Sequence, residues 1–296
     1  MITEISSSTK TVTISPDGPT IVIGERINPT ARKKLGEALL DGNVELVRRE
    51  AISQVEAGAQ VLDVNVGYPG VDEPRMIQEA VKAVMESVDV PICLDSANPE
   101  VMEAALEVYK GKILLSSVTG EDRKLEQILP LVKRYGTAVV ALTMDDSGIP
   151  NDPGARLEIA RKIVGRAEAL GIPRADIIVD CACMTCSTDS RAAAVTLEAI
   201  RLVRQELGCN QTLGASNVSF GLPERKVINA AYLPMVLAAG VNCPIVDPTV
   251  PEISKAILAS DLLLGKDEYG MNYLSAFRAR QAALEASSPT DPRGKV

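Results

Sequence analysis

Residues 58–67 read Gly-Ala-Gln-Val-Leu-Asp-Val-Asn-Val-Gly, and they contain the unit from which the rest of the chain is built. The run over 61–64 is short, apolar and rich in β-branched side chains, as a strand buried on both faces is. A helical pattern over 43–57 precedes this run and stops at a glycine, and a second helical pattern over 73–87 follows it. This stretch therefore predicts a β-strand between two helices.

The same alternation recurs along the chain. Short apolar runs predict eight strands, at residues 21–23, 61–64, 91–94, 113–115, 138–142, 177–179, 212–215 and 243–246. Amphipathic segments predict helices at residues 43–57, 73–87, 99–109, 123–135, 155–170, 190–207, 224–239 and 250–264. Eight β-α units in strict alternation predict an α/β fold, a single-domain (β/α)8 TIM barrel. An open doubly wound sheet is the alternative.

The two ends of the chain differ in pattern from this repeat. We expect the barrel domain to cover residues 1–286, with residues 1–19 as an N-terminal extension. Polar and apolar residues alternate over 9–19, which predicts a hairpin strand that closes the floor of the barrel. The polar, proline-containing segment 287–296 predicts a disordered tail.

Composition and charge restrict the possible partners and location. The net charge of −8 disfavours nucleic acid, because an acidic surface repels phosphate. No apolar run approaches the roughly 18 residues of a membrane span. The first residues lack the apolar core of an export signal, and six cysteines in a chain of 296 residues do not suggest a disulfide scaffold. We therefore expect a cytoplasmic protein.

The chain contains no histidine. Histidine is the commonest general acid–base residue and the commonest metal ligand, so its absence excludes a Ser-His-Asp triad and any histidine-ligated metal site. Chemistry in this protein must depend on carboxyl, amide, hydroxyl, thiol, amine, guanidinium and backbone groups.

Polar residues follow most of the predicted strands. In a parallel barrel the carboxyl ends of all strands meet at one rim, so Asp63, Asp95, Asp180 and Asn217 are expected to lie near one another. A single Asp after a strand is most often a helix N-cap, but its repetition around the rim predicts a shared site. Such a rim suits a divalent cation, or a flat heterocycle with adjacent N–H donors.

Four motifs at strand ends carry a resemblance to a known family: residues 23–28 (IGERIN), 62–67 (LDVNVG), 93–96 (CLDS) and 214–219 (GASNVS). They resemble the pterin-binding family and, within it, the methyltetrahydrofolate:corrinoid-protein methyltransferases. The folate module of cobalamin-dependent methionine synthase and, more distantly, dihydropteroate synthase are relatives of that group. The resemblance extends from about residue 21 to about residue 277.

The resemblance implies roles for individual residues. Asp95 and Asp180 match the acceptors that bind the pterin ring, and Asn217 matches the catalytic amide that reaches N5. The other matching positions are Gly214 and Ser216 beside the ring, Arg225 at the pocket, Asp63 and Asn65 at the rim of the second strand, and Ser116 where the family often has Asn.

The resemblance also implies a reaction. The methyl group would move between N5 of methyltetrahydrofolate and the cobalt of a corrinoid (cobalamin) carried by a separate corrinoid protein, in a direction that the sequence does not set. The chain lacks the histidine-containing motif with which proteins hold a corrinoid themselves. The resemblance further implies a homodimer.

Two other functions and one other site stay open. A dihydropteroate synthase-like enzyme is disfavoured because residues 25–28 read Glu-Arg-Ile-Asn and not Asn-Val-Thr-Pro. A non-catalytic module that binds pterin or a corrinoid protein is the second alternative. Cys181, Cys183 and Cys186 could form a thiolate metal site, but small apolar packing is the favoured interpretation, and we expect no metal.

Overall fold

The computed structural model describes residues 1–287 and contains a closed barrel of eight parallel strands in the order β10-β3-β4-β5-β6-β7-β8-β9. This confirms the predicted TIM barrel over the open sheet. The barrel strands are β3 (Ile23–Ile27), β4 (Val61–Val64), β5 (Ile92–Asp95), β6 (Leu114–Thr119), β7 (Ala138–Leu142), β8 (Ile177–Asp180), β9 (Asn210–Gly214) and β10 (Cys243–Val246).

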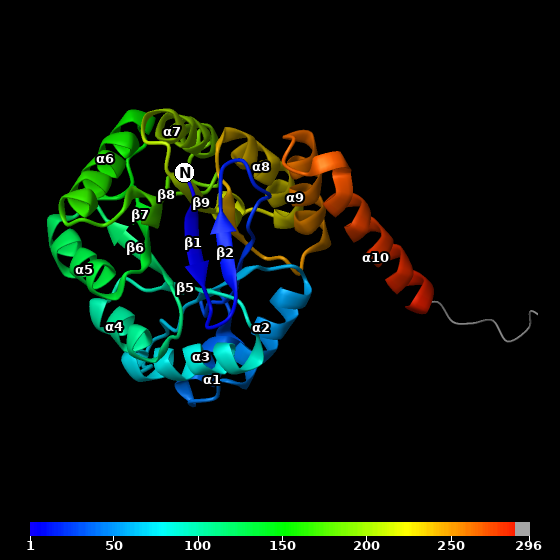
Figure 1. Cartoon of the computed structure of the whole chain (residues 1–296), viewed down its shortest axis with the longest axis horizontal. Coiled ribbons are helices and arrows are strands. Elements are labelled where there is room, and N and C mark those ends of the chain that lie inside the picture. The colour runs from blue at the N-terminus through cyan, green and yellow to red at the C-terminus, as the bar shows by residue number, and fades with distance from the viewer. Residues whose placement is uncertain (288–296) are drawn as a thin grey trace, which may run out of the picture.

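Helices surround the barrel as an outer ring (Figure 1). They are α1 (Lys33–Leu40), α2 (Glu45–Glu56), α3 (Glu73–Ser87), α4 (Pro99–Val108), α5 (Asp122–Tyr135), α6 (Pro153–Ala169), α7 (Ala192–Glu206), α8 (Arg225–Ala239) and α9 (Pro251–Leu263), and a further helix, α10 (Met271–Ser287), lies outside this ring. Three short 3-10 turns join them, η1 (Arg174–Asp176), η2 (Ala215–Ser219) and η3 (Glu268–Gly270). None of the helices described over residues 1–287 combines the length and apolar character that crossing a membrane requires.

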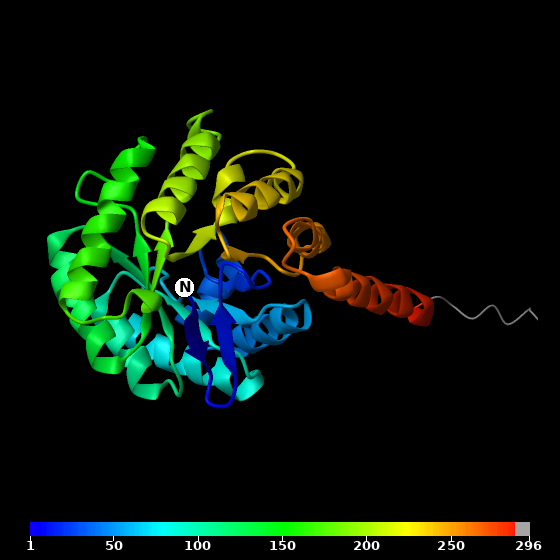
Figure 2. The same ribbon diagram turned by 45° about the horizontal axis from the view of Figure 1, so that its top comes forward.

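An antiparallel hairpin of β1 (Thr3–Ser6) and β2 (Thr11–Ile14) lies across one end of the barrel (Figures 1 and 2). Ile5 and Ile14 are fully buried and pack against side chains inside the barrel, such as Ile23 and Val61. The N–H of Ser6 donates to the carbonyl of Lys112, just before β6 begins. The hairpin therefore closes the amino-terminal end of the barrel, which we call the floor.

Apolar residues form two layers, one inside the barrel and one between the strands and the helices. The inner layer uses small and branched side chains, among them Ala138, Val140 and Cys243. A chain in which only 3% of residues are aromatic fills its core in this way. Such branched residues dominate the interior layers of TIM barrels.

Two strands differ from their predicted positions at the ends that carry the polar residues. The first strand lies at Ile23–Ile27 and not at 21–23, and the fourth extends to Thr119 and not to 115. Their pairing shifts register between Gly24 and Ile27 and between Leu115 and Val118, respectively. Such irregularities change the direction in which side chains point. Glu25 lies in the irregular part of β3, and Ser116 lies in that of β6.

The irregular part of β3 is held by a buried glutamine of α2. The side-chain oxygen Oε1 of Gln54, which is fully buried, accepts a 2.8 Å hydrogen bond from the backbone N–H of Arg26. A side chain at Gly24 would bring its Cβ to 2.5 Å from that same oxygen. The glycine of the IGERIN motif therefore allows Gln54 to replace a missing ladder hydrogen bond.

Two helices of the structure have no counterpart in the predicted elements. α1 is a short helix between β3 and α2, and α10 follows the last barrel helix and projects away from the barrel (Figure 2). The predicted tail over 287–296 lies, apart from Ser287, outside the described residues.

Candidate active site

A cavity of about 320 Å³ opens at the carboxyl ends of the strands, at the opposite end of the barrel from the hairpin. We call it the mouth cavity. It is lined by Glu25, Asn28, Asp63, Asp95, Ser116, Ser117, Val140, Leu142, Ile149, Asp180, Ala182, Cys183, Gly214, Asn217 and Ile245. The strand ends thus bring together six of the residues that the sequence placed in one site.

Four carboxyl groups share this cavity: Glu25, Asp63, Asp95 and Asp180. Burial raises the pKa of Asp180 to about 6 and that of Asp95 above its ordinary value. Asp63 is 4% exposed, and burial together with the neighbouring charge of Asp95 raises its pKa well above the ordinary range. Desolvation penalises the charged form of each group, so the cavity holds carboxyl groups that gain from N–H donors.

Asp95 is held by two amides from neighbouring strands. Its Oδ2 accepts a hydrogen bond of 2.9 Å from Nδ2 of Asn65 and one of 3.4 Å from Nδ2 of Asn28. Asn65 does not line the cavity itself, and its place behind Asp95 gives it an orienting role. Both amides approach the same oxygen, which leaves the second oxygen of Asp95 for another donor.

Asp180 is fixed by the backbone that follows β8. Its Oδ1 accepts a 2.7 Å hydrogen bond from the N–H of Ala182, which adopts a positive φ of 58°. The fully buried guanidinium of Arg156 donates to the carbonyls of Cys181 and Ala182, at 2.8 Å each, and to that of Pro150 at 2.7 Å. One side chain of α6 therefore ties together the two loops that follow β7 and β8.

Asn217 lies on η2, the 3-10 turn that follows β9. The side chain is exposed toward the cavity, and its Nδ2 would lie 3.0 Å from a Cβ placed on Gly214. A residue with a side chain at position 214 would press against the amide of Asn217. Gly214 thus sets how closely Asn217 approaches the end of β9.

Ser216 is part of η2 and Arg225 supports that turn, and neither residue lines the cavity. The guanidinium of Arg225 donates to the carbonyl of Ser216 at 2.8 Å and to the hydroxyl of Ser219 at 3.0 Å. The hydroxyl of Ser216 donates to Oε1 of Glu25 at 2.8 Å. The structure therefore places both residues in contact with the loop that carries Asn217.

Glu25, Asn28 and Ser117 line the cavity but are not among the predicted site residues. Glu25 and Asn28 belong to the IGERIN motif, so the signal was present in the sequence. The strand predicted at 21–23 ended before them, and their direction could not be read without the register shift in β3. The apolar side chains of Val140, Leu142 and Ile149 form a further part of the wall.

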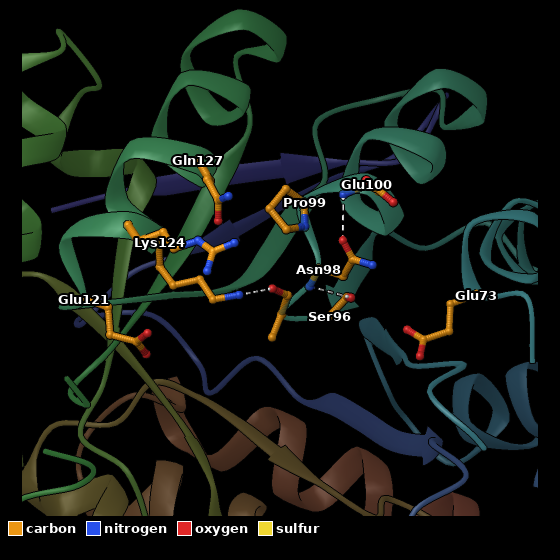
Figure 3. A pocket seen from close by; sticks show the side chains of 10 residues that line it. Glu73, Ser96, Asn98, Pro99, Glu100, Glu121, Lys124 and Gln127 are labelled. Carbon is orange, nitrogen blue, oxygen red and sulfur yellow. Dashed lines mark hydrogen bonds between the residues drawn. The ribbon is translucent and has the colours of Figure 1, made fainter. Parts of the chain in front are cut away.

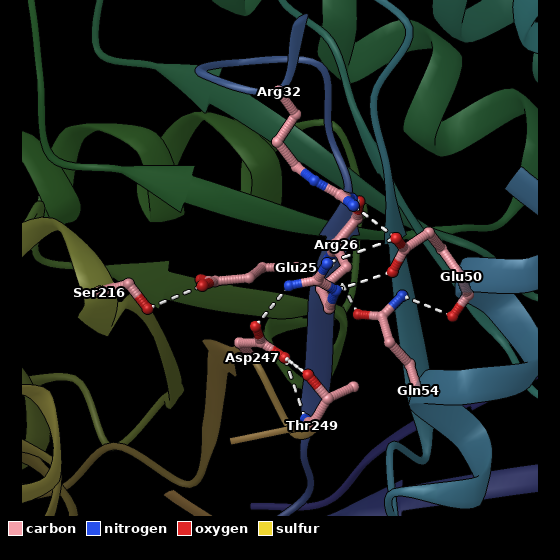
Figure 4. A network of polar contacts seen from close by, with 8 residues as sticks. All are labelled: Glu25, Arg26, Arg32, Glu50, Gln54, Ser216, Asp247 and Thr249. Carbon is pink, nitrogen blue, oxygen red and sulfur yellow. Dashed lines mark hydrogen bonds and ion pairs between the residues drawn. The ribbon is translucent and has the colours of Figure 1, made fainter. Parts of the chain in front are cut away.

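Charged residues form a network beside Glu25 (Figure 4). Arg26 pairs with Glu50 of α2 and with Asp247 after β10, both at 2.7 Å. Arg32 contacts the same Glu50. Burial alone would raise the pKa of Glu50, but its hydrogen bonds to the two arginines outweigh burial and lower it. This network lies where β10, the last strand of the barrel in the sequence, pairs with β3, the first.

A second, larger hollow of about 640 Å³ lies outside the barrel between the first turns of α4 and α5 (Figure 3). Its charged residues have both signs, with Glu73, Glu100 and Glu121 beside Arg123 and Lys124. Lys124 already donates to the carbonyl of Ala97 at 2.7 Å. No buried carboxyl lines this hollow, so the mouth cavity is the better candidate for chemistry.

Two of the three clustered cysteines, Cys181 and Cys183, have separate side-chain partners, and Cys183 lines the mouth cavity. Cys181 is fully buried, with its Sγ 3.4 Å from Oε1 of Gln211, and Cys183 lies 3.8 Å from the hydroxyl of Tyr232. Burial raises the pKa of Cys183 to about 12, which keeps this thiol protonated at neutral pH. Among residues 1–287, no group of three or more acidic, cysteine or histidine side chains has an arrangement that could hold a metal ion.

The sequence of this chain is similar to those of known proteins. The family described as pterin binding enzyme matches residues 24–247. The methylcorrinoid:tetrahydrofolate methyltransferase of Eubacterium limosum is 33% identical over 266 residues, which are 87% of this chain and 96% of that protein. The methionine synthase of Mycobacterium tuberculosis is 32% identical over 255 residues, which are 82% of this chain and 21% of that protein.

Solved structures of dihydropteroate synthase from Xanthomonas albilineans share the fold. One with 4-aminobenzoic acid has a TM-score of 0.66 at 18% identity and covers 89% of this chain and 98% of its own. Another, in complex with 7,8-dihydropteroate, has a TM-score of 0.61 at 19% identity and covers 85% of this chain and 95% of its own. The family match over residues 24–247 and the Eubacterium limosum relative decide the assignment: the chain belongs to the pterin binding enzyme family.

Proposed function

We propose that this protein is a methyltransferase that moves the methyl group between N5 of methyltetrahydrofolate and the cobalt of a corrinoid carried by a partner protein. The observation that carries the proposal is the mouth cavity, in which oriented carboxyl groups and the exposed amide of Asn217 face one space. A relative named methylcorrinoid:tetrahydrofolate methyltransferase, matched over 96% of its length, supports the same reaction.

The carboxyl groups suit the polar edge of a pterin. The 2-amino-4-oxo pyrimidine edge presents two adjacent N–H donors, and a carboxylate can accept both in parallel. Asp95 has an oxygen free of the two asparagine amides, and Asp180 faces the same cavity from the end of β8, three strands around the barrel from β5. Val140 and Leu142 supply an apolar surface for the flat ring. Binding the ring would therefore relieve the desolvation of both carboxyl groups.

Asn217 is suited to assist the departure of N5. A tertiary amine is a poor leaving group, so negative character on N5 must be stabilised as its bond to the methyl carbon breaks. The amide N–H of Asn217 can donate to N5 in that transition state, and a contact that strengthens there accelerates the step. The amide also offers an oxygen that accepts a hydrogen bond once N5 carries a proton.

The partner would bring the corrinoid to the open side of the cavity. No histidine exists in the chain to serve as a lower ligand to cobalt, so the corrinoid enters this proposal as a co-substrate on a separate corrinoid protein. We place the reaction in the cytoplasm, and neither nucleic acid nor a membrane takes part in it.

We also propose a homodimer built on α10. Met271, Leu274 and Phe277 are spaced three residues apart on this projecting helix, and each side chain is exposed by 42% or more. Residues at that spacing lie on neighbouring positions of one helix face. Leu274→Glu should shift the protein from dimer to monomer in sedimentation equilibrium, whereas a wild-type protein that sediments as a monomer would contradict the proposal.

Absorbance spectroscopy tests the proposed reaction directly. The purified protein is mixed with methyltetrahydrofolate and either Co(I) cobalamin or a reduced corrinoid protein, and the methylcobalamin spectrum is followed. Methylcobalamin should form in proportion to enzyme. If neither corrinoid is methylated although the folate binds, the protein is a binding module, and formation of dihydropteroate from a pterin pyrophosphate would instead identify a dihydropteroate synthase.

A further inference from the structure

Glu25 is a polar group of the mouth cavity that the proposed mechanism has not yet used. It lies on the irregular part of β3 and is half-buried, and its carboxyl group points toward η2 (Figure 4). Its Oε1 accepts the 2.8 Å hydrogen bond from the hydroxyl of Ser216, the residue before Asn217. Glu25 is therefore connected to the loop that carries the catalytic amide, and it lines the same cavity.

The groups around Glu25 leave it without an ion pair. Arg26 on the same strand turns to Glu50 and Asp247, and Arg225 of α8 is engaged by the backbone of η2. Among the described residues, Glu25 forms no salt bridge. The charges that face it are Asp247 after β10 and Asp63 on β4, which favour its protonated form, and Arg225 and Arg26, which favour its ionised form.

Burial is the largest influence on this carboxyl group. It raises the pKa of Glu25 to about 7, and the hydrogen bond from Ser216 offsets part of that rise. A carboxyl group in this environment is present in both forms near neutral pH. It can therefore give up or take up a proton during a reaction at that pH, as an efficient acid–base group must.

The proposed reaction needs one proton for each methyl group. When methyltetrahydrofolate loses its methyl group, N5 exchanges a carbon substituent for a hydrogen, and that proton must be supplied. The amide of Asn217 cannot release a proton at neutral pH, and no imidazole exists in the chain. A titratable carboxyl group of the cavity can supply it.

We propose, on the basis of the methyltransferase function above, that Glu25 supplies the proton that N5 gains and receives it back in the reverse reaction. In the forward direction, the neutral carboxyl group transfers its proton to N5, directly or through water in the cavity, and becomes a carboxylate. The N5–methyl bond breaks, its electron pair stays on nitrogen, and the methyl group bonds to cobalt through the electron pair of Co(I). In reverse, the carboxylate accepts the proton that N5 loses.

The other carboxyl groups of the cavity are less suited to this role. Asp95 is held by the amides of Asn65 and Asn28, and Asp180 by the backbone N–H of Ala182, contacts that favour ring recognition. Asp63 is almost completely enclosed. Glu25 is bonded to η2 itself through Ser216, whereas Asp180 reaches only the backbone of Gly214, which precedes this turn.

The test is the pH dependence of single-turnover methyl transfer in wild type and Glu25→Gln, measured from about pH 5 to about pH 9. The forward rate of wild type should fall above the titration of Glu25, and the reverse rate should rise. Glu25→Gln should be slower in both directions by ~10²-fold or more and should lose this pH-dependent limb. Its affinity for methyltetrahydrofolate, measured by equilibrium dialysis, should stay close to that of wild type.

Three further variants separate a proton-transfer role from a structural one. Ser216→Ala removes a hydrogen bond that favours the carboxylate form of Glu25. The pH above which the forward rate falls should therefore be higher in this variant than in wild type. Glu25→Asp should keep a pH-dependent limb at a lower rate. Glu100→Gln, an exposed carboxyl of the second hollow, should match wild type.

The outcomes distinguish the inference from the function on which it rests. Methyl transfer by wild type with the same rate and profile in Glu25→Gln would overturn the role of Glu25 and leave the methyltransferase intact. Absence of methyl transfer in wild type would overturn the function itself. If the forward rate of Ser216→Ala falls at the same pH as that of wild type, this would also count against Glu25 as the titrating group.

Discussion

At the floor of the barrel the buried amides of Asn210 and Asn242 are paired with neighbouring groups, whereas at the mouth buried carboxyl groups face an open cavity. At the floor, Nδ2 of Asn210 donates to the hydroxyl of Thr3 and the carbonyl of Ile14, and its Oδ1 accepts from Nδ2 of Asn242. At the mouth, Asp63 and Glu25 have raised pKa values because few donors replace their lost hydration.

This contrast shows how one barrel divides its tasks between two ends. The floor gains stability from paired polar groups and packed apolar side chains. The mouth contains carboxyl groups that obtain their remaining hydrogen-bond donors only when a ligand binds. Buried polar groups are costly when unpaired, so such an arrangement persists where function requires it. Substitutions at the two ends test whether stability and ligand binding are separated in this way.

The largest expected effect is on the stability of the floor. Ile14→Ala removes a fully buried side chain and leaves a cavity, which should lower the free energy of unfolding by about 2–5 kcal/mol. Urea denaturation measures the change. Because the mouth lies at the other end, the dissociation constant for methyltetrahydrofolate should be unaltered under native conditions, and a large loss of affinity would show that the two ends are coupled.

The next largest effect is on turnover at the mouth. Asn217→Ala removes the proposed hydrogen bond to N5 and should lower kcat by ~10²-fold or more, as the loss of a single oxyanion donor does. Stopped-flow formation of methylcobalamin measures it. The exposed position of Asn217 predicts little change in unfolding free energy, and an unchanged kcat would remove this residue from the mechanism.

A third substitution should move stability and binding in opposite directions. Asp95→Asn keeps an oxygen for the amides of Asn65 and Asn28 but removes a desolvated charge and an acceptor for the pterin edge. The affinity for methyltetrahydrofolate should fall by about 10- to 100-fold. The free energy of unfolding should rise by on the order of 1 kcal/mol. Calorimetric titration and thermal unfolding of the same preparations would test both, and a less stable variant would contradict the contrast between the two ends.

The smallest effect is on the pH dependence of stability. Burial raises the pKa of folded Glu25 to about 7, whereas the unfolded carboxyl ionises near 4.5. Its stabilising protonated form is fully present below the unfolded value, and that contribution is lost as pH rises through the folded value. Relative to wild type, Glu25→Gln should therefore become more stable as pH rises from about 5 to about 8. Parallel stability curves for the two proteins in urea would show that Glu25 titrates normally.

The barrel and much of its mouth could be predicted because both follow from local patterns. Buried parallel strands require short apolar runs, and a polar residue such as Asp180 at the end of one must face the rim. The direction of Glu25 could not be predicted in this way, since it depends on a register shift held by Gln54 from a helix that comes later in the chain.

Other features depend on contacts distant in sequence. Arg225 was expected at the pocket and instead holds the backbone of η2, a distinction that only the folded loop makes. The helix α10 follows α9 with no strand between them, so the β-α alternation that marks the helices of the barrel does not mark it.

The floor hairpin imposes an order on folding during synthesis. Thr3 and its partner Asn210 are separated by 207 residues, so at about 5–20 residues per second roughly 10–40 s pass between their appearances. A two-stranded hairpin is marginally stable alone in water. Ile5 and Ile14 can contact early partners such as Ile23, but Thr3 cannot pair with Asn210 until β9 has emerged, so closing the floor belongs among the last events of assembly. The hairpin strands β1 and β2 are thus made before β9 and complete their docking only after it.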